Sequence, residues 1–266
     1  MHAASREALE ALTAEVSFSD VASAAQTGTE LFEVVEALDG DRGLRIAVAD
    51  QAAPVEKRME LLKTLFASRV SAATLAVLEK ATAKNWSYPR EYRAGLIILG
   101  RRAILSAAQL EGRLPQVEEE LFRLSRLLCD EPQLVSLLSD RNAPAQKKRE
   151  LFASVLYGKV TSFTEALALQ VVGRPENNVI DDIEALSKFA AELQNRDIAK
   201  VRTSVALNEG QEKALAEKLG QIYGRAMSIH AEVDSSLLGG MIVHVGDEVI
   251  DGSISGMLAK MRARLA

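Results

Sequence analysis

The chain has 266 residues, of which 48% are hydrophobic and only 5% aromatic, which favours one large domain or two to three small ones built mostly from helices. The net charge is −5 with both signs well mixed, which excludes the clustered basic surface of nucleic-acid-binding proteins. The single cysteine, Cys129, excludes an internal disulfide, and with only three histidines we expect no metal site and no cofactor.

No apolar run reaches the roughly 20 residues that a membrane-spanning helix needs. The longest such run, 95–100, ends at Arg101. The first residues, Met1 to Glu7, also lack the apolar centre of a secretory signal. We therefore expect a protein that is soluble by itself and meets a membrane only through a partner.

The first part of the chain has the apolar spacing of short helices. A break is expected at 84–89, because a helix ends before a proline such as Pro89. A longer helix is predicted after the break, from about 91 to 111. Before the break, helices are predicted at 20–38, 43–49, 54–66 and 72–83.

The next stretch shows the same order of helices. Leu114 opens a helix that ends near Asp130 and carries acidic residues in its first turn, where the helix dipole favours them. A brief helix follows to Leu138, and Asn142 with Pro144 close behind it marks the start of another. Two further helices are predicted, at 162–172 and 179–195.

These two stretches are copies of one another at an offset of 90 residues. Between 30 and 76, the residue 90 positions later is identical at 14 of 47 positions, against roughly 3–5 expected from composition alone. Phe32 with Phe122 and Pro54 with Pro144 are among the identities. We therefore predict tandem helical bundles.

The last forty residues change to a different pattern. Apolar residues alternate with polar ones at 229–233 and again at 241–245, which is the pattern of half-buried strands. The turn-rich segment 234–240 joins them, so a β-hairpin is expected. Ile254, Met257, Leu258 and Met261 then recur at helical spacing. The predicted fold is mainly α, with tandem helical bundles followed by a small C-terminal α+β domain.

This C-terminal arrangement closely resembles the signature of the delta subunit of bacterial F-type ATP synthase, which is homologous to the oligomycin-sensitivity-conferring protein. An Asp-x-x-Leu-x-Gly-Gly turn between two strands, followed by Ile-Asp-Gly-Ser at fixed spacing, is hard to match by chance. The residues that carry the resemblance are Met227, Ile229, Val233, Asp234, Leu237, Gly239, Gly240, Val243, His244, Gly246, Val249, Ile250, Asp251, Gly252 and Ser253.

The resemblance implies three domains. The ordinary delta subunit begins near Gly95, so 1–94 is an extra N-terminal helical repeat, similar to that of actinobacterial forms. By resemblance, 95–198 is the helical bundle that binds the catalytic head, and 199–266 is the α+β domain that binds the peripheral stalk. The implied function is a stator element that keeps the head from rotating with the central shaft.

Implied partners are the N-terminal segments of the alpha subunit and the b subunit of the peripheral stalk, at the cytoplasmic face of the cell membrane. In the family, the first and fifth helices of the bundle border a groove that holds an alpha-subunit helix. Apolar residues on these two helices are core candidates first, and about a third of them are expected to serve the groove. They are Ile104, Leu105, Ala108, Phe163, Leu167 and Val171.

No residue pattern indicates catalysis. The sequence has no phosphate-binding Gly-x-x-x-x-Gly-Lys-Ser/Thr loop, and His230 and His244 are expected at the surface or across strands rather than as catalytic bases. Two other functions were weighed: a cytosolic helical-repeat adaptor unrelated to ATP synthase, and a hydrolase using His244 with a nearby serine. The C-terminal signature argues against the adaptor, and the lack of a nucleophile elbow argues against the hydrolase.

Overall fold

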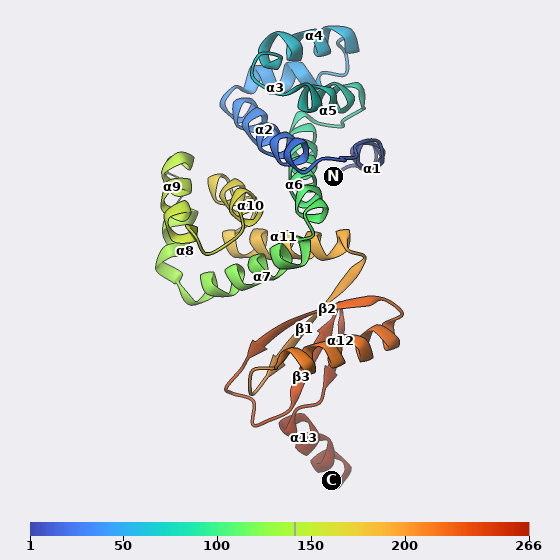
Figure 1. Cartoon of the computed structure of the whole chain (residues 1–266), viewed down its shortest axis with the longest axis vertical. Coiled ribbons are helices and arrows are strands. Elements are labelled where there is room, and N and C mark those ends of the chain that lie inside the picture. The colour runs from blue at the N-terminus through green and yellow to red at the C-terminus, as the bar shows by residue number, and fades with distance from the viewer. Residues whose placement is uncertain (141, 266) are drawn as a thin grey trace. The chain divides into compact units, whose positions relative to one another are not determined.

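A computed structural model of the protein describes residues 1–140 and 142–265. Over these residues the chain forms thirteen helices and one four-stranded sheet near the C-terminus (Figure 1). This confirms the predicted fold class, mainly α with a small α+β part. Among the described residues, no helix is long and apolar enough to cross a membrane.

The chain packs into two compact units. The helical unit comprises Met1–Val117 and Ser136–Glu176, and the sheet unit comprises Glu118–Val135 and Asn177–Ala266. This division follows the packing and cuts across the boundaries of the three predicted domains. The assignment of separate functions to those three domains stays a prediction.

All ten helices predicted before the sheet are present, and one additional helix, α1, precedes them. In the described part of the chain, the helices before the first strand are α1 Ala3–Glu15, α2 Val21–Gly40, α3 Arg42–Ala49, α4 Val55–Phe66, α5 Ala72–Ala83, α6 Pro89–Leu110, α7 Leu114–Asp130, α8 Pro132–Ser139, α9 Ala145–Leu156, α10 Ser162–Gly173 and α11 Val179–Leu193.

Helix positions reproduce the 90-residue offset of the sequence. The bounds of α3, α4 and α5 plus 90 are the bounds of α8, α9 and α10. Caps repeat as well: Ser71 at the start of α5 and Thr161 at the start of α10 each accept the backbone N–H three residues on, at 3.3 Å. Ser71, through its backbone N–H, and Thr74, through its hydroxyl, also donate to the carboxylate of Glu30. Burial alone would raise the pKa of Glu30, but the hydrogen bonds to its carboxylate outweigh burial, so the pKa is lowered.

The N-terminus is tied to the start of α6 through Glu91, a buried carboxylate. Its Oε2 accepts the Ser5 hydroxyl at 2.7 Å, and its Oε1 accepts the His2 backbone N–H at 2.9 Å and lies 2.8 Å from His2 Nδ1. The Ser5 hydrogen bond is the main cause that lowers the pKa of Glu91 from 4.5 to about 2. Glu91 is therefore ionised in the folded protein over the whole neutral range.

A hydrophobic core fills the helical unit around α2 and α6. Helix α2 contributes Leu31, Val34 and Leu38, and α6 contributes Leu96 and Ile97, all at most 1% exposed. The long apolar stripes of both helices predict this burial, because a helix of a globular protein turns its apolar face to the core. Helices α1, α3, α4 and α5 add further buried residues to the same cluster.

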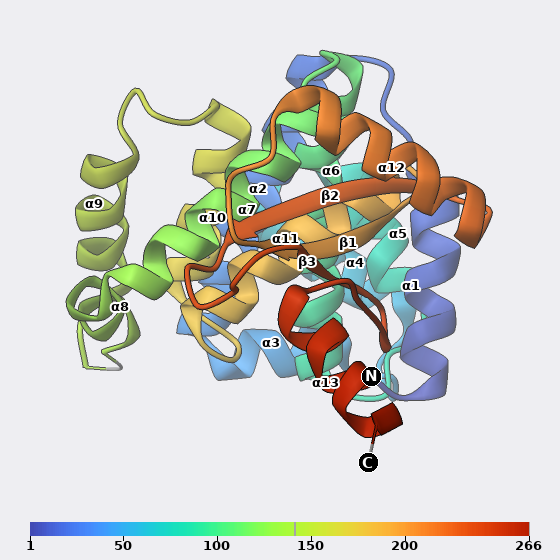
Figure 2. The same ribbon diagram turned by 90° about the horizontal axis from the view of Figure 1, so that it is seen from below.

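The sheet has the strand order β2-β1-β3-β4. Strand β1 pairs in parallel with β2, and the connection between them is α12; β1 with β3 and β3 with β4 are antiparallel. Helix α12 runs along β2 (Figure 2) and covers a small core of Ala199, Val201, Leu219, Met227 and Val243. The element bounds are β1 Arg196–Thr203, α12 Glu209–Tyr223, β2 Ala226–Val233, β3 Met241–Val245, β4 Glu248–Asp251 and α13 Ile254–Leu265.

The predicted hairpin between 229–233 and 241–245 is wrong. Both segments are strands, but β1 lies between them in the sheet. The hairpin in this sheet joins β3 and β4 through Gly246 and Asp247, with Gly246 at φ 56°. The partner of β2 is β1, which precedes α12 in the chain, because two parallel strands need a long crossover connection between them. The turn-rich segment 234–240 then leads from β2 to β3, which pairs with the other edge of β1.

Candidate functional site

The adjacent glycines Gly239 and Gly240 of the C-terminal signature hold the start of α13. Ile254 N–H donates to the Gly239 carbonyl at 3.0 Å, and Gly252 N–H donates to the Met241 carbonyl at 3.0 Å. Gly240 has φ 80°, and a Cβ there would overlap the Gly252 carbonyl oxygen. The Gly-Gly pair is therefore required for close backbone approach between the loop before β3 and the loop before α13.

The Asp-Gly-Ser part of the signature caps α13. Ser253 donates its hydroxyl and its backbone N–H to Asp251, at 2.7 and 2.9 Å, and its oxygen accepts the Gly256 N–H at 3.0 Å. A Cβ at Gly256 would overlap the Asp251 carboxylate. The side chains of Asp251 and Ser253 thus satisfy the first backbone donors of the helix, as an N-cap does.

Asp234 orders the beginning of the same loop. Its backbone N–H donates to the Thr203 carbonyl at 2.7 Å, and its carboxylate accepts the hydroxyl and the N–H of Ser236 at 2.6 and 2.9 Å. These hydrogen bonds from Ser236 lower the pKa of Asp234. Leu237 N–H closes the turn on the Asp234 carbonyl at 3.1 Å. The signature residues therefore have a structural role: together they fix where α13 leaves the sheet.

An exposed apolar surface follows directly from this fixed start. On α13, Ile254, Met257, Leu258 and Met261 are 45–54% exposed. Neighbouring strand β4 and the signature loop add three more exposed apolar side chains: Val249, Ile250 and Leu238. Because Ile254, Met257, Leu258 and Met261 lie on one face of the helix, we call these four residues the α13 surface. Exposed apolar side chains that share a helix face are typical of protein–protein contacts.

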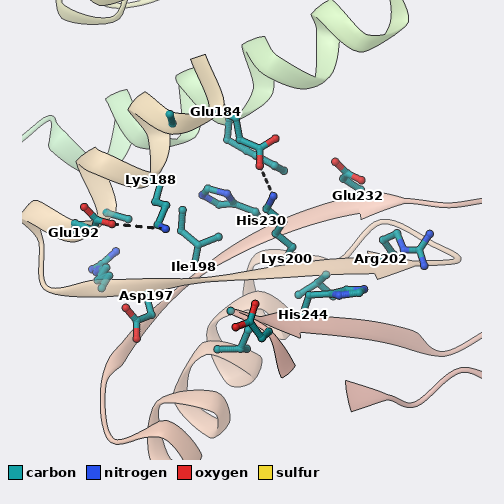
Figure 3. Close-up of a pocket in the computed structure, with 18 of the residues that line it drawn as sticks. Glu184, Lys188, Glu192, Asp197, Ile198, Lys200, Arg202, His230, Glu232 and His244 are labelled. Carbon is teal, nitrogen blue, oxygen red and sulfur yellow. Dashed lines mark hydrogen bonds and ion pairs between the residues drawn. The ribbon is translucent and has the colours of Figure 1, made fainter. Parts of the chain in front are cut away.

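A second feature of the sheet unit is a groove of about 1040 Å³ between α11 and the sheet (Figure 3). Charged side chains of both signs line it. Helix α11 contributes Glu184, Lys188 and Glu192, and β1 contributes Lys200 and Arg202. The signs are balanced, so the groove has no excess charge that would indicate an anionic or cationic ligand.

Ion pairs join the helices of the sheet unit to its strands. Arg126 of α7 binds Glu184 of α11 at 2.5 Å and Glu232 of β2 at 2.6 Å, and Lys200 of β1 also binds Glu184. Burial alone would raise the pKa of Glu184, but the hydrogen bond from Lys200 and the two positive charges outweigh it, and the pKa is lowered. These residues form one network, which we call the Arg126 network.

His230 lies beside this network; it is a cross-strand neighbour of Lys200, and the alternative prediction that it lies at the surface is wrong. Its side chain is 3% exposed, its Nε2 lies 3.2 Å from Oε1 of Glu118, and its ring stacks on Phe122 with centroids 4.1 Å apart. Gln194 donates to the other oxygen of Glu118 at 2.8 Å. A buried carboxylate needs such partners, so this pair anchors β2 to α7.

Comparison with known proteins decides the family. The sequence model of the family described as ATP synthase delta (OSCP) subunit matches residues 102–265. This match covers more than half of the chain.

The chain belongs to the ATP synthase delta (OSCP) subunit family.

Full-length relatives agree with this assignment, and each is named ATP synthase subunit delta. That of Corynebacterium efficiens is 58% identical over 271 residues, covering 100% of this chain and 99% of the relative. Those of Corynebacterium glutamicum strain R and Corynebacterium diphtheriae are 59% identical over 271 and 273 residues, covering 100% of both chains in each case. These relatives therefore span the extra N-terminal repeat as well.

Among solved structures, a chain in the structure described as Toxoplasma gondii mitochondrial ATP synthase hexamer has a TM-score of 0.36 at 15% identity, over 62% of this chain and 94% of that chain. That similarity is too weak to bear on the argument. Family membership confirms the predicted resemblance: the protein is a delta (OSCP) subunit of ATP synthase, a stator component and a non-catalytic subunit of the complex. An adaptor unrelated to ATP synthase is not supported.

The six candidate residues for head binding lie together on α6 and α10 of this delta subunit, and all are core residues of the helical unit. Each is at most 7% exposed. Their share in partner binding stays a prediction. The buried pair of His230 with Glu118 was missed, because its members are 112 residues apart in the sequence and no local pattern connects them.

Proposed function

We propose that this delta subunit joins the catalytic head of ATP synthase to the peripheral stalk by binding N-terminal segments of the alpha subunit and the b subunit. Within the proposal, 95–198 binds the head and 199–266 binds the stalk, at the cytoplasmic face of the cell membrane and only through the complex. Membership of a family of stator components supports this function. A stator must carry torque, so it needs firm contacts at both ends.

The observation that carries the stalk contact is the α13 surface. Half-exposed apolar side chains on one helix offer a face on which an amphipathic helix from a stalk polypeptide can bury its own apolar stripe. Gly240, Asp251 and Ser253 fix the beginning of α13 through hydrogen bonds and close packing. A helix whose first turn is fixed to the sheet transmits force better than a helix on a flexible linker, which suits a stator.

A single substitution tests the stalk contact. Met257→Asp in the full-length protein places a carboxylate at the α13 surface, and we expect binding to a b-subunit fragment to weaken by about tenfold or more, because the charge must be desolvated in the contact. Ile222→Asp on α12 is the matched control, since Ile222 is also exposed but lies outside the surface. Isothermal titration calorimetry measures both, with circular dichroism to check folding.

Equal binding by the two variants would remove α13 from the stalk contact. If Ile222→Asp weakened binding and Met257→Asp did not, the stalk would instead bind the α12 side of the sheet unit.

A further inference from the structure

The extra repeat shares a helix with the second bundle. At the offset of 90, α6 begins where α11 does, so it is the last helix of the first copy. In the same register, α1 corresponds to 93–105, which lies inside α6, so α6 is also the first helix of the second copy. One helix therefore belongs to both bundles, and the extra repeat is not an appendage on a linker.

Helix α2 of the extra repeat packs directly onto the head-binding candidates. It contacts both α6 and α10, which also contact each other. Gly28 and Gly100 allow the approach: a Cβ on Gly28 would lie 2.6 Å from the Ile104 side chain and 2.9 Å from the Gly100 carbonyl, and a Cβ on Gly100 would lie 2.6 Å from Phe32. Helix α2 thus lies against the side of α6 to which Ile104 belongs, and it also contacts α10.

Ion pairs tie the same helix to the second copy. Arg149 of α9 binds Glu36 of α2 at 2.6 Å, and Arg174, just after α10, binds Asp39 of α2 at 2.9 Å. Arg93 of α6 also binds Asp39, at 2.6 and 2.8 Å. α2 is therefore held to α6, to α9 and to the end of α10.

These contact residues are specific to the first copy. At the offset of 90, the second copy has Glu118 in place of Gly28, Arg126 in place of Glu36 and Cys129 in place of Asp39. α7 therefore lacks the small residue and both carboxylates that α2 uses in this contact. The two copies have diverged where α2 meets the second bundle.

A second face of α2 is buried in the hydrophobic core of the extra repeat, which keeps α2 packed against α6 and α10. Leu31, Val34 and Leu38 are at most 1% exposed and belong to the core of the extra repeat. Pulling α2 away from α6 and α10 would expose these side chains to water and open the first bundle. An incoming helix cannot take the place of α2 without unfolding that repeat.

We propose that α2 is the resident occupant of the face of α6 and α10, and that the catalytic head binds this delta subunit through another surface. The extra repeat then supplies from within the chain the helix that this face takes. This inference rests on the proposed head binding, and it excludes the six buried residues of α6 and α10 as contacts with the head.

A covalent lock tests the inference on the full-length protein. Glu36→Cys and Arg149→Cys are introduced together with Cys129→Ser, because Cys129 is exposed and would react. A short bis-maleimide joins the two cysteines and holds α2 in place. The matched control is the same triple variant with its cysteines capped singly by N-ethylmaleimide, and binding to the detached catalytic head is measured for both.

High cross-linking yield is expected in the native protein, and the locked form is expected to bind the head within about twofold of the capped control. Locked protein that binds the head about tenfold more weakly, or a yield no higher than in urea, would overturn the inference. If the unmodified protein itself does not bind the head, the proposed function fails, and this outcome is distinct from a loss that appears only on locking.

Discussion

Replacing Gly240 by alanine should destabilise the start of α13 much more than the same change at Gly246. Both glycines have positive φ, 80° and 56°, so each alanine costs about 1–2 kcal/mol of backbone strain, partly offset by about 0.4–1 kcal/mol from the stiffer unfolded chain. At Gly246 a Cβ meets nothing within 4 Å. We therefore expect a net loss of about 1 kcal/mol for Gly246→Ala.

At Gly240 the new Cβ also overlaps the Gly252 carbonyl and lies 3.0 Å from Ser253 Cα, both of which are backbone atoms. Relief requires moving the α13 start, which breaks the hydrogen bonds of Gly252 and Ile254 at about 1 kcal/mol each. The expected total is about 3 kcal/mol. Hydrogen exchange of 248–258, followed with increasing urea, gives the local opening free energy of each variant. Equal losses in the two variants would refute the argument from close approach.

Three further changes test the hydrogen bonds and ion pairs of buried and half-buried side chains. His230→Leu should lower the free energy of unfolding by about 2 kcal/mol, because a buried carboxylate loses a partner, whereas His244→Leu at the groove should change it by less than about 0.5 kcal/mol; urea titration measures both. Arg126→Ala should lower the free energy of unfolding by about 1 kcal/mol and Arg126→Lys by less, since lysine keeps the positive charge but cannot bind Glu184 and Glu232 at the same time. Equal losses in the two variants would contradict the bridging role of Arg126. The third change is Glu91→Gln. The pKa of Glu91 is about 2 in the folded protein and 4.5 ordinarily, so the wild type should be more stable than the variant above pH 4.5 and should lose this advantage as the pH falls through 2. A difference in the free energy of unfolding that does not shrink between pH 7 and pH 3 would contradict the role of the Ser5 hydrogen bond.

The helices were predictable because their signals are local. Apolar periodicity, caps such as Asp20 and Ser71, and Pro89 at a helix start all act within a few residues. The repeat gave two sequences for one arrangement, and the agreement of α3, α4 and α5 with α8, α9 and α10 confirms the offset of 90. Helices α1 and α12 had no predicted counterpart.

Strand pairing was not predictable in the same way. Glycines at 239 and 240 indicate a turn, but nothing in the segment 234–240 says that it passes to the far side of β1. The parallel pairing of β1 with β2 is a contact across α12, and such contacts leave no short-range pattern. The glycines hold the chain against the beginning of α13 rather than closing a hairpin.

The head-binding candidates show a second limit. Periodicity places Ile104 and Leu167 on apolar faces, but it does not tell whether such a face meets the protein's own core or a partner. Both residues are buried, and α2, from the extra repeat, lies against Ile104. The packing of α2 onto this face is seen in the three-dimensional structure and has no local sequence signal.

The most direct test of the central claim is proton-driven ATP synthesis by membranes from which this delta subunit has been removed, measured with and without adding the protein back. We expect depleted membranes to keep ATP hydrolysis by the head but to lose ATP synthesis, and the added full-length protein to restore it, because the head then no longer turns with the shaft. Undiminished synthesis by depleted membranes would contradict the stator function.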